Sequence, residues 1–390
     1  MFKYLFISLL LIFLVACQSF EMTHLRPNEV FADKDFIGFE QVPIENSGEI
    51  FRLQEDAKLF AKASIAGVRD PQEQIKALVS AIFNRSDFNL LYRADANSVA
   101  QTTFENRSAN CLSLSIMTYA LARELGFGAR FQHIEIPEYW TRREGQRLLN
   151  SHINLQILPK QNRAFVELTR QGFEVDFDAQ AIKKHDKRTL LSQSQVVGLF
   201  YNNKGSDALL HRQDKRAYAY FRAGYLADPN QAHLLANLGY LYRLNGLYKS
   251  AERVYLQAIE VDENNLTAWQ NLAFLYRHTN QHDKALTIWA RLARQRANNP
   301  FYHLSLGDEA FENQDWPAAL SYYRKALTLD KSLHEVFFGL AKTYYEMGQI
   351  KRSEHFLILA RKKSRSQAEQ DIYAGKIEFL RRRVLDDSAS

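Results

Sequence analysis

The sequence predicts two architectures in one chain, an α+β domain followed by an all-α solenoid built from repeats. In the first half, apolar residues with helical spacing precede several short β-rich segments, the order expected when an antiparallel sheet packs against a central helix. In the second half, a pattern of apolar and small residues returns every 34 residues from about residue 196. A period of this length indicates stacked helical units.

The N-terminal residues predict export. A single lysine, Lys3, precedes the uncharged apolar run Tyr4–Ala16, which is too short to span a bilayer comfortably and is typical of a signal peptide. The run ends in Leu14-Val15-Ala16-Cys17 and resembles the bacterial lipobox, in which the cysteine sulfur receives diacylglycerol. We therefore expect a lipoprotein signal peptide over residues 1–16 and a lipid anchor on Cys17.

Residues 17–50 show no sustained periodicity, so we expect a lipidated N-terminus and a tether there. Gln18 follows the cysteine, and by the sorting rule of enteric bacteria a residue other than Asp implies the periplasmic face of the outer membrane. No later apolar run approaches transmembrane length. The predicted location is thus the bacterial cell envelope, with the chain held to a membrane by lipid.

The overall charge by itself excludes few classes of binding partner. A formal net charge of +6 with 13% aromatic residues suits anionic lipid or polysaccharide as well as nucleic acid, and the export signal argues against nucleic acid. The basic runs 183–188 and 381–383 are interpreted as solvated faces, with contact to an anionic surface as the alternative.

Helices and then strands are predicted within the α+β domain, which we assign to residues 51–190. Helical spacing runs from Phe51 to Phe83 with a break near residues 67–71, and again from Cys111 to Leu125. Gly126 is expected to end this second stretch. Four β-rich segments follow, at residues 129–136, 152–158, 164–169 and 173–178.

The repeat columns contain leucines, small residues and large aromatics in fixed register. The three clearest columns are Leu238, Leu272, Leu306 and Leu340; Gly239, Ala273, Gly307 and Ala341; and Phe221, Tyr255, Trp289, Tyr323 and Leu357. Small residues let paired helices approach closely, and the large residue fills the space between one pair and the next. The pattern resembles the tetratricopeptide repeat, with five units over residues 196–367 and a capping helix and tail over 368–390.

One repeat column departs from that family. Gly224, Ala258, Ala326 and Ala360 share a small position, whereas Leu292 places a bulky side chain there. The resemblance implies a concave surface that binds a peptide or protein ligand.

Cys111 is the candidate nucleophile. The chain has two cysteines, and with Cys17 taken by lipid no internal disulfide is possible, although a thiol in an oxidising compartment needs a reason to persist. Cys111 opens the predicted helix, where backbone N–H groups and the helix dipole favour a thiolate and offer donors to an oxyanion. The alternative is that Cys111 merely fills a core position.

A base and an orienting acid follow in order. His152 opens one predicted strand and Asp176 lies near the end of another. With the Asn-Cys-Leu-Ser start at residue 110 and the Ala-Arg-Glu-Leu-Gly helix end at residue 122, the region from about 75 to 180 resembles the transglutaminase-like superfamily, whose core is related to papain. The resemblance assigns Cys111 as nucleophile, His152 as general base and acid, and Asp176 as the group that orients the imidazole.

Alternatives to these assignments stay open at the level of sequence. Asp178 lies on the same strand face as Asp176, and His133 and His185 are further histidines of the region. The tryptophan that often follows the catalytic histidine in the family is replaced, and Asn154 stands near its place. No oxyanion side chain is evident.

The predicted function is acyl transfer from an amide to water or to an amine, without a cofactor. A metal site has weak support, because no histidine or carboxylate lies at ligand spacing from the thiol. The second hypothesis is a catalytically silent adaptor lipoprotein whose repeats scaffold envelope complexes. Nothing in the sequence indicates the oligomeric state.

Overall fold

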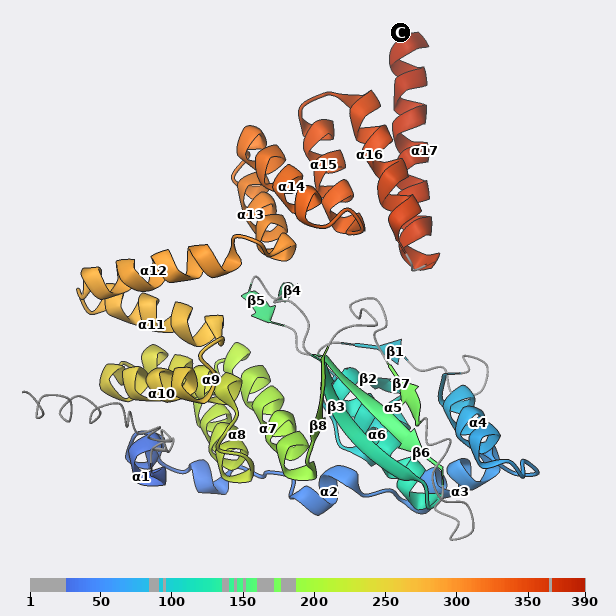
Figure 1. Ribbon diagram of the computed structural model, residues 1–390, viewed down its shortest axis with the longest axis vertical. Coiled ribbons are helices and arrows are strands. Elements are labelled where there is room, and N and C mark those ends of the chain that lie inside the picture. Colours follow the sequence, from blue (N-terminus) through green and yellow to red (C-terminus); the bar gives the residue numbers. More distant parts are fainter. Residues whose placement is uncertain are drawn as a thin grey trace, which may run out of the picture.

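The computed structural model describes residues 26–83, 91–93, 96–134, 140–143, 146–149, 152–159, 172–176, 187–364 and 367–389. An α+β domain is followed by a curved array of helices, which rises beside and above it (Figure 1). This confirms the predicted fold class. Among the described residues, none of the helices has both the length and the apolar character needed to cross a membrane.

The first described segment, residues 26–46, is packed against the repeats. It contains α1 (Pro27–Val30) and two 3-10 turns, Asp33–Asp35 and Phe39–Gln41. Val30, Phe36 and Phe39 are buried in the same core as the first repeats, and the ring of Phe36 stacks on that of Tyr218 with centroids 4.3 Å apart. The predicted tether is therefore wrong from residue 26 onward, because aromatic side chains anchor the chain there.

Hydrogen bonds from two buried tyrosines fix the same segment. The Tyr218 hydroxyl accepts from the Ala32 N–H at 3.0 Å and donates to Asp33 Oδ1 at 2.6 Å. The Tyr242 hydroxyl donates to the Val30 carbonyl at 2.9 Å. Burial raises the pKa of both tyrosines well above the ordinary value, so both hydroxyls keep their protons and can donate.

Helices form one side of the α+β domain. They are α2 (Ser47–Phe51), α3 (Glu55–Ser64), α4 (Pro71–Phe83), α5 (Ala100–Asn106) and α6 (Cys111–Glu124). The central helix α6 is buried on nearly all sides, as expected of a helix that is apolar all round. It ends as predicted, because Gly126 adopts a φ of +79°, a left-handed conformation that favours glycine.

The main sheet is antiparallel with strand order β7-β6-β3-β8. Its strands are β3 (Gly128–Ile134), β6 (His152–Leu158), β7 (Phe173–Val175) and β8 (Arg188–Leu191). Two further pairs are β1 (Leu91–Tyr92) with β2 (Ser108–Ala109), and β4 (Trp140–Arg143) with β5 (Gln146–Leu149). The strand predicted over residues 164–169 lies outside the described residues. Strands β3, β6 and β7 match predicted segments, whereas the two short pairs and β8 were not predicted.

Five helical hairpins occupy residues 193–363, which are described without a gap. They are α7 (Gln193–Leu210) with α8 (Asp214–Ala227), α9 (Ala232–Leu244) with α10 (Tyr248–Val261), α11 (Leu266–His278) with α12 (His282–Arg296), α13 (Pro300–Glu312) with α14 (Trp316–Leu329), and α15 (His334–Glu346) with α16 (Ile350–Lys363). Helix α17 (Gln367–Ala389) packs on α16, where a capping helix was predicted.

The small columns are contact positions, as predicted. A Cβ added at Gly239 would lie 2.5 Å from the Tyr255 ring, and one at Gly307 would lie 2.5 Å from the Tyr323 ring. At Gly224 it would lie 2.3 Å from Leu234 of the next hairpin. Glycine is thus required for the close approach of helices both within a repeat and between repeats.

The regular stacking is interrupted between the third and fourth repeats. The buried Leu292 occupies the position that is Gly224 or alanine in the other repeats. The backbones of α12 and α13 pack little on each other, although the Arg296 guanidinium lies over the Tyr302 ring at 5.9 Å, and the buried core divides at this point into separate clusters. The array therefore consists of a block of three repeats followed by a block of two.

Adding a methyl group at Gly239 tests the contact role of the small column. Gly239→Ala should lower the midpoint of urea unfolding by the equivalent of about 1–3 kcal/mol, because the Tyr255 ring cannot yield without disturbing the hairpin. Gly375→Ala is the matched control, since an added Cβ there meets no atom within 4 Å and alanine favours a helix by about 1 kcal/mol. Equal midpoints for Gly239→Ala and wild type would contradict the packing interpretation.

Candidate active site

Cys111 is the first residue of α6, as predicted. Its side chain is half-buried, and the preceding residue, Asn110, caps the helix: its Oδ1 accepts from the Ser113 N–H at 2.9 Å. The cap leaves the N–H of Leu112 pointing out of the helix end beside the thiol. The local sequence Asn-Cys-Leu-Ser therefore builds a capped helix N-terminus with a sulfur on its first turn.

The lengths of α6 and of the strand that follows it place the first turn of α6 level with one end of the sheet. Helix α6 has 14 residues and β3 has 7, so they extend about 21 Å and about 23 Å. A tight turn at Gly126 joins them, so the two elements run antiparallel, and the end of β3 comes back to the start of α6. In the sheet register, Ile134 at the end of β3 pairs with His152 at the start of β6. Cys111 and His152 therefore lie at the same end of the domain.

Asp176 directly follows β7, which pairs with β6, the strand that begins at His152. The register pairs Val175 with Leu155, so Asp176 continues the ladder opposite Asn154. Since side chains alternate along a strand, Asp176, Asn154 and His152 share one face of the sheet. The side chain of His152 lies outside the described residues, as do Asp178, His185 and Cys17.

A second histidine reaches the same end of the sheet. His133 on β3 pairs with Ile153 and lies one residue before Ile134. By alternation it shares the side of Phe131, which packs against α6 through Tyr119 with ring centroids 4.7 Å apart. His133 is thus the described histidine to be compared with His152 in any test of the base.

Further polar side chains line the face that carries Asp176, and of these the sequence singled out Asn154 alone. Asn154 Nδ2 donates to Glu174 Oε1 at 2.6 Å, and the Arg188 guanidinium donates to the same oxygen at 3.0 Å. Asn154 Oδ1 and Gln132 Oε1 are buried and make no hydrogen bond to any described residue. Buried amide oxygens without a partner are uncommon in proteins, and the alternation of polar and apolar residues from His152 onward was the signal that could have marked this strip.

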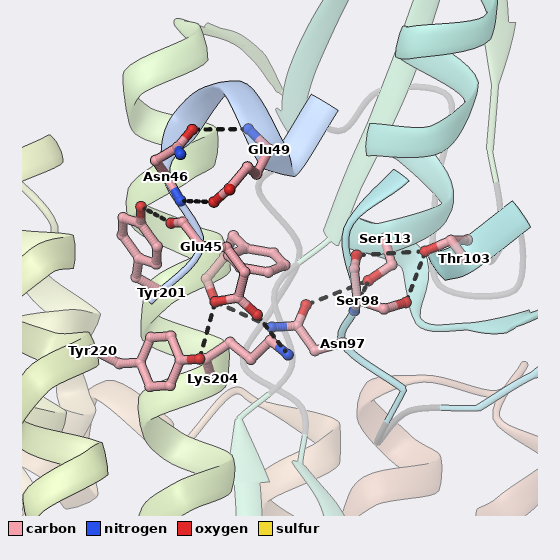
Figure 2. Close-up of polar contacts among 11 residues, drawn as sticks. Glu45, Asn46, Glu49, Asn97, Ser98, Thr103, Ser113, Tyr201, Lys204 and Tyr220 are labelled. Carbon is pink, nitrogen blue, oxygen red and sulfur yellow. Dashed lines mark hydrogen bonds and ion pairs between the residues drawn. The ribbon is translucent and has the colours of Figure 1, made fainter. Parts of the chain in front are cut away.

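Asn97 connects the first repeat to the turn that carries the thiol (Figure 2). Its Nδ2 donates to the Phe200 carbonyl of α7 at 3.1 Å, and its Oδ1 accepts from Ser113 Oγ at 3.4 Å. Ser113 Oγ also accepts from the Ser98 N–H at 3.0 Å. No sequence pattern marks Asn97, because its partner in the repeats lies 103 positions away.

Glu45 forms a second connection in the same region (Figure 2). Its carboxylate accepts from the Tyr220 hydroxyl at 3.0 Å and pairs with Lys204 at 3.3 Å, and its carbonyl accepts from the Tyr201 hydroxyl. Burial and the Glu45 charge together raise the pKa of Tyr220 to about 12. Residues before the domain are thus bonded to both helices of the first repeat.

Within the residues that the structure describes, histidine, cysteine and carboxylate side chains do not gather in threes as a metal ion would require. The described residues build a capped helix N-terminus carrying a thiol at the same end of the domain as His152 and Asp176, which by strand alternation lie on the face of the sheet turned away from α6.

Comparison with known families agrees with both halves of the chain. A model of the transglutaminase-like superfamily matches residues 58–173, and tetratricopeptide repeat models match residues 232–265, 254–287 and 307–348. The chain joins a transglutaminase-like domain to tetratricopeptide repeats. The family match begins in α3 and ends at β7, so it includes both Cys111 and His152.

Individual relatives are distant. Protein bimA from Emericella nidulans is 26% identical over 113 residues, which are 28% of this chain and 14% of that protein. Anaphase-promoting complex subunit 3 from Schizosaccharomyces pombe is 25% identical over 133 residues, which are 34% of this chain and 20% of that protein. The matches thus span a fifth or less of these relatives.

Among solved structures, YrrB, a TPR protein with an unusual peptide-binding site, aligns at 18% identity over 46% of this chain and 92% of that chain, with a TM-score of 0.26.

A charge placed at the helix cap tests the electrostatic role of the first turn. Asn110→Asp keeps the oxygen that accepts the Ser113 N–H but adds a negative charge next to Cys111, which disfavours a thiolate. We expect the pH profile of Cys111 alkylation to move to higher pH. Asn110→Ser, which keeps an uncharged cap oxygen, is the control, and superimposable profiles for the two variants would exclude such an effect.

Proposed function

We propose that this protein is a membrane-anchored cell-envelope enzyme that transfers an acyl group from an amide through Cys111, and that its repeats bind the peptide or protein partner. The observation that carries the proposal is the position of Cys111, at the capped N-terminus of α6 and at the sheet end where β6 begins. The match to the transglutaminase-like superfamily over residues 58–173 supports it.

The chemistry follows from these positions. The Cys111 thiolate attacks the amide carbonyl carbon, and the oxyanion that forms is stabilised by first-turn N–H groups, with that of Leu112 a candidate donor. His152 gives its proton to the departing amine as the carbon–nitrogen bond breaks, which leaves a thioester. His152 then takes a proton from water as the water attacks, releasing the acid and the thiol. Asp176 holds the imidazole in orientation.

Hydrolysis is preferred over cross-linking as the outcome, because water needs no second binding site. An amine that attacks the same thioester would give the transferase reaction with the same three residues. Peptides or proteins of the cell envelope are the natural substrates for a chain that carries a lipoprotein signal at residues 1–16 and a lipid on Cys17. Anchoring by this lipid at the periplasmic face of the outer membrane is part of the proposal.

The first experiment measures the pH dependence of alkylation of Cys111 in a chain that begins at residue 18, where Cys111 is the only thiol. We expect alkylation to stay fast well below the ordinary cysteine pKa of about 8.5. His152→Ala should slow it about tenfold near pH 6, because the imidazolium no longer stabilises the thiolate.

Two histidine variants serve as comparisons in that experiment. His133→Ala tests the other histidine at the same sheet end, and His355→Ala, exposed on α16, tests loss of a distant one. Neither should change the profile. A profile that depends on His133 and not on His152 would transfer the role of base to His133. Slow alkylation with no histidine dependence would favour the catalytically silent adaptor.

Lipid attachment is tested independently of catalysis. In bacteria that express the full chain, radiolabelled palmitate should be incorporated, and the protein should fractionate with outer membranes. The Cys17→Ser variant should lose both the label and the membrane association, because serine has no sulfur to receive the lipid. The Cys111→Ser variant should retain both. Label on the Cys17→Ser variant would contradict the assignment.

A further inference from the structure

Helix α17 ends the repeat array and carries apolar side chains on two of its faces. On one face Tyr373, Ile377 and Leu380 are buried in a core shared with α15 and α16. On the other face Ile372 and Phe379 are 56% and 58% exposed. The helix that caps a repeat array needs a polar outer face, because no further repeat packs on it. Two large exposed apolar residues therefore indicate that this face of α17 packs on another molecule.

The exposed apolar residues of α17 belong to a stripe with the spacing of a helix-pairing seam. Four exposed residues recur at intervals of three, four and three positions, namely Ile372, Gly375, Phe379 and Arg382. This spacing places them along one side of the helix, and we call them the α17 seam. Because α17 lies at the free end of the array (Figure 1), the seam is accessible to a second helix.

Packing within the chain does not explain the glycine of the seam. A Cβ added at Gly375 would meet no atom within 4 Å, and glycine in the middle of a helix costs about 1 kcal/mol relative to alanine. At Gly239 and Gly307, by contrast, an added Cβ would lie 2.5 Å from a tyrosine ring. Gly375 therefore leaves an open space on the outer face of α17, in which a large side chain of another molecule can approach the backbone.

The two ends of the seam carry opposite charges. Asp371 flanks the start of the seam and Arg382 forms its end, and both side chains are exposed. Both have contacts within α17 itself: Gln367 Nε2 donates to Asp371 Oδ1 at 2.8 Å, and Arg382 pairs with Glu378. Both charges therefore remain at the surface, where each can pair with an opposite charge on another molecule.

We propose that the α17 seam binds the same seam of a second copy of this chain, with the two helices antiparallel. Phe379 of each copy then fills the open space over Gly375 of the other, and the alkyl stem of Arg382 covers Ile372. Asp371 of each copy lies beside Arg382 of the other, so two ion pairs flank the apolar centre. Parallel helices would instead place each charge beside its like. The contact is two-fold symmetric, because both copies use the same surface.

The dimer should be of moderate affinity. Two single helices bury less surface than the roughly 800 Å² per partner of a standard interface, so we expect a dissociation constant on the order of 10 µM. The chain would then be monomeric at about 1 µM, a concentration suited to unfolding measurements, and mostly dimeric at about 100 µM. The dimer is independent of the proposed catalysis, because Cys111 takes no part in it.

Sedimentation equilibrium tests the dimer with the chain that begins at residue 18, in reducing agent so that no disulfide forms through Cys111. The mass should rise from that of one chain to that of two between about 1 and 100 µM. Ile372→Ser with Phe379→Ser should raise the dissociation constant at least about tenfold, because the apolar centre is lost.

The matched control removes two exposed leucines from outer helices of the array. Leu256→Ser with Leu286→Ser, on α10 and α12, should leave the dissociation constant unchanged. An equal loss in this control would show association through exposed apolar surface in general and would overturn the proposal. A chain that stays monomeric up to about 100 µM would also overturn it.

Charge reversal tests the antiparallel orientation. Asp371→Arg alone should weaken the dimer about tenfold, because it places two pairs of like charges together. Adding Arg382→Asp to the same chain should restore the affinity, since the two ion pairs form again with their signs exchanged. Circular dichroism checks that α17 stays helical in each variant. A single variant that associates like wild type, or a double variant that stays weak, would overturn the proposed pairing.

An anionic membrane is the competing partner for a stripe that carries both apolar and basic residues. Vesicles of phosphatidylglycerol should therefore be mixed with the same chain and sedimented. We expect Ile372→Ser with Phe379→Ser to leave the amount of vesicle-bound chain unchanged. Vesicle binding that this variant abolishes would assign the seam to lipid and overturn the proposal.

Discussion

The packing of α7 against the α+β domain is the contact on which the rest of the structure depends. The first half of this helix places Val196, Val197 and Phe200 in the core formed by α6 and the sheet. Its second half places Ala208 and Leu209 in the core of the repeats. One helix therefore completes two hydrophobic cores, and burial of apolar surface on both sides is what orients the array relative to the domain.

This shared helix explains why the thiol and the repeats are linked by hydrogen bonds. The Phe200 carbonyl that accepts from Asn97 belongs to the part of α7 that lies in the domain core. Asn97 in turn bonds Ser113, whose N–H is held by the cap at Asn110. A displacement of α7 would thus reach the first turn of α6 through two side chains. Glu45 adds to the contacts of the first repeat through Lys204 and Tyr220.

The sequence was most informative where structure is local or periodic. The 34-residue period located the hairpins, because helix contacts recur at fixed positions, and Gly126 marked the end of α6 because the left-handed turn favours glycine. The position of Cys111 at a helix start followed from its neighbours. That Asp176 and Asp178 share one strand face also followed from sequence, but the choice between them did not, and the face that Asp176 shares with His152 required the register of β6 and β7.

What the sequence could not supply depends on distant partners. The segment over residues 26–46 has no periodicity, and its burial depends on Tyr218 and Tyr242, nearly two hundred positions further on. Asn97, Gln132 and the buried amide of Asn154 acquire their meaning only from the register of strands and from α7. The division of the buried core after α12 coincides with Leu292, a bulky residue in a small column, but it depends on how α12 and α13 pack and could not be predicted from that residue alone.

The packed N-terminal segment also determines how the protein can be handled as a recombinant sample. A fragment that starts at the domain boundary near residue 51 would leave the faces of Tyr218, Phe221 and Tyr242 in water, since Val30, Phe36 and Phe39 share their core. An exposed apolar patch of this kind promotes self-association. Soluble expression therefore depends on retaining residues 26–50, although their sequence shows no sustained periodicity. A truncated chain should begin before residue 26, not after residue 50.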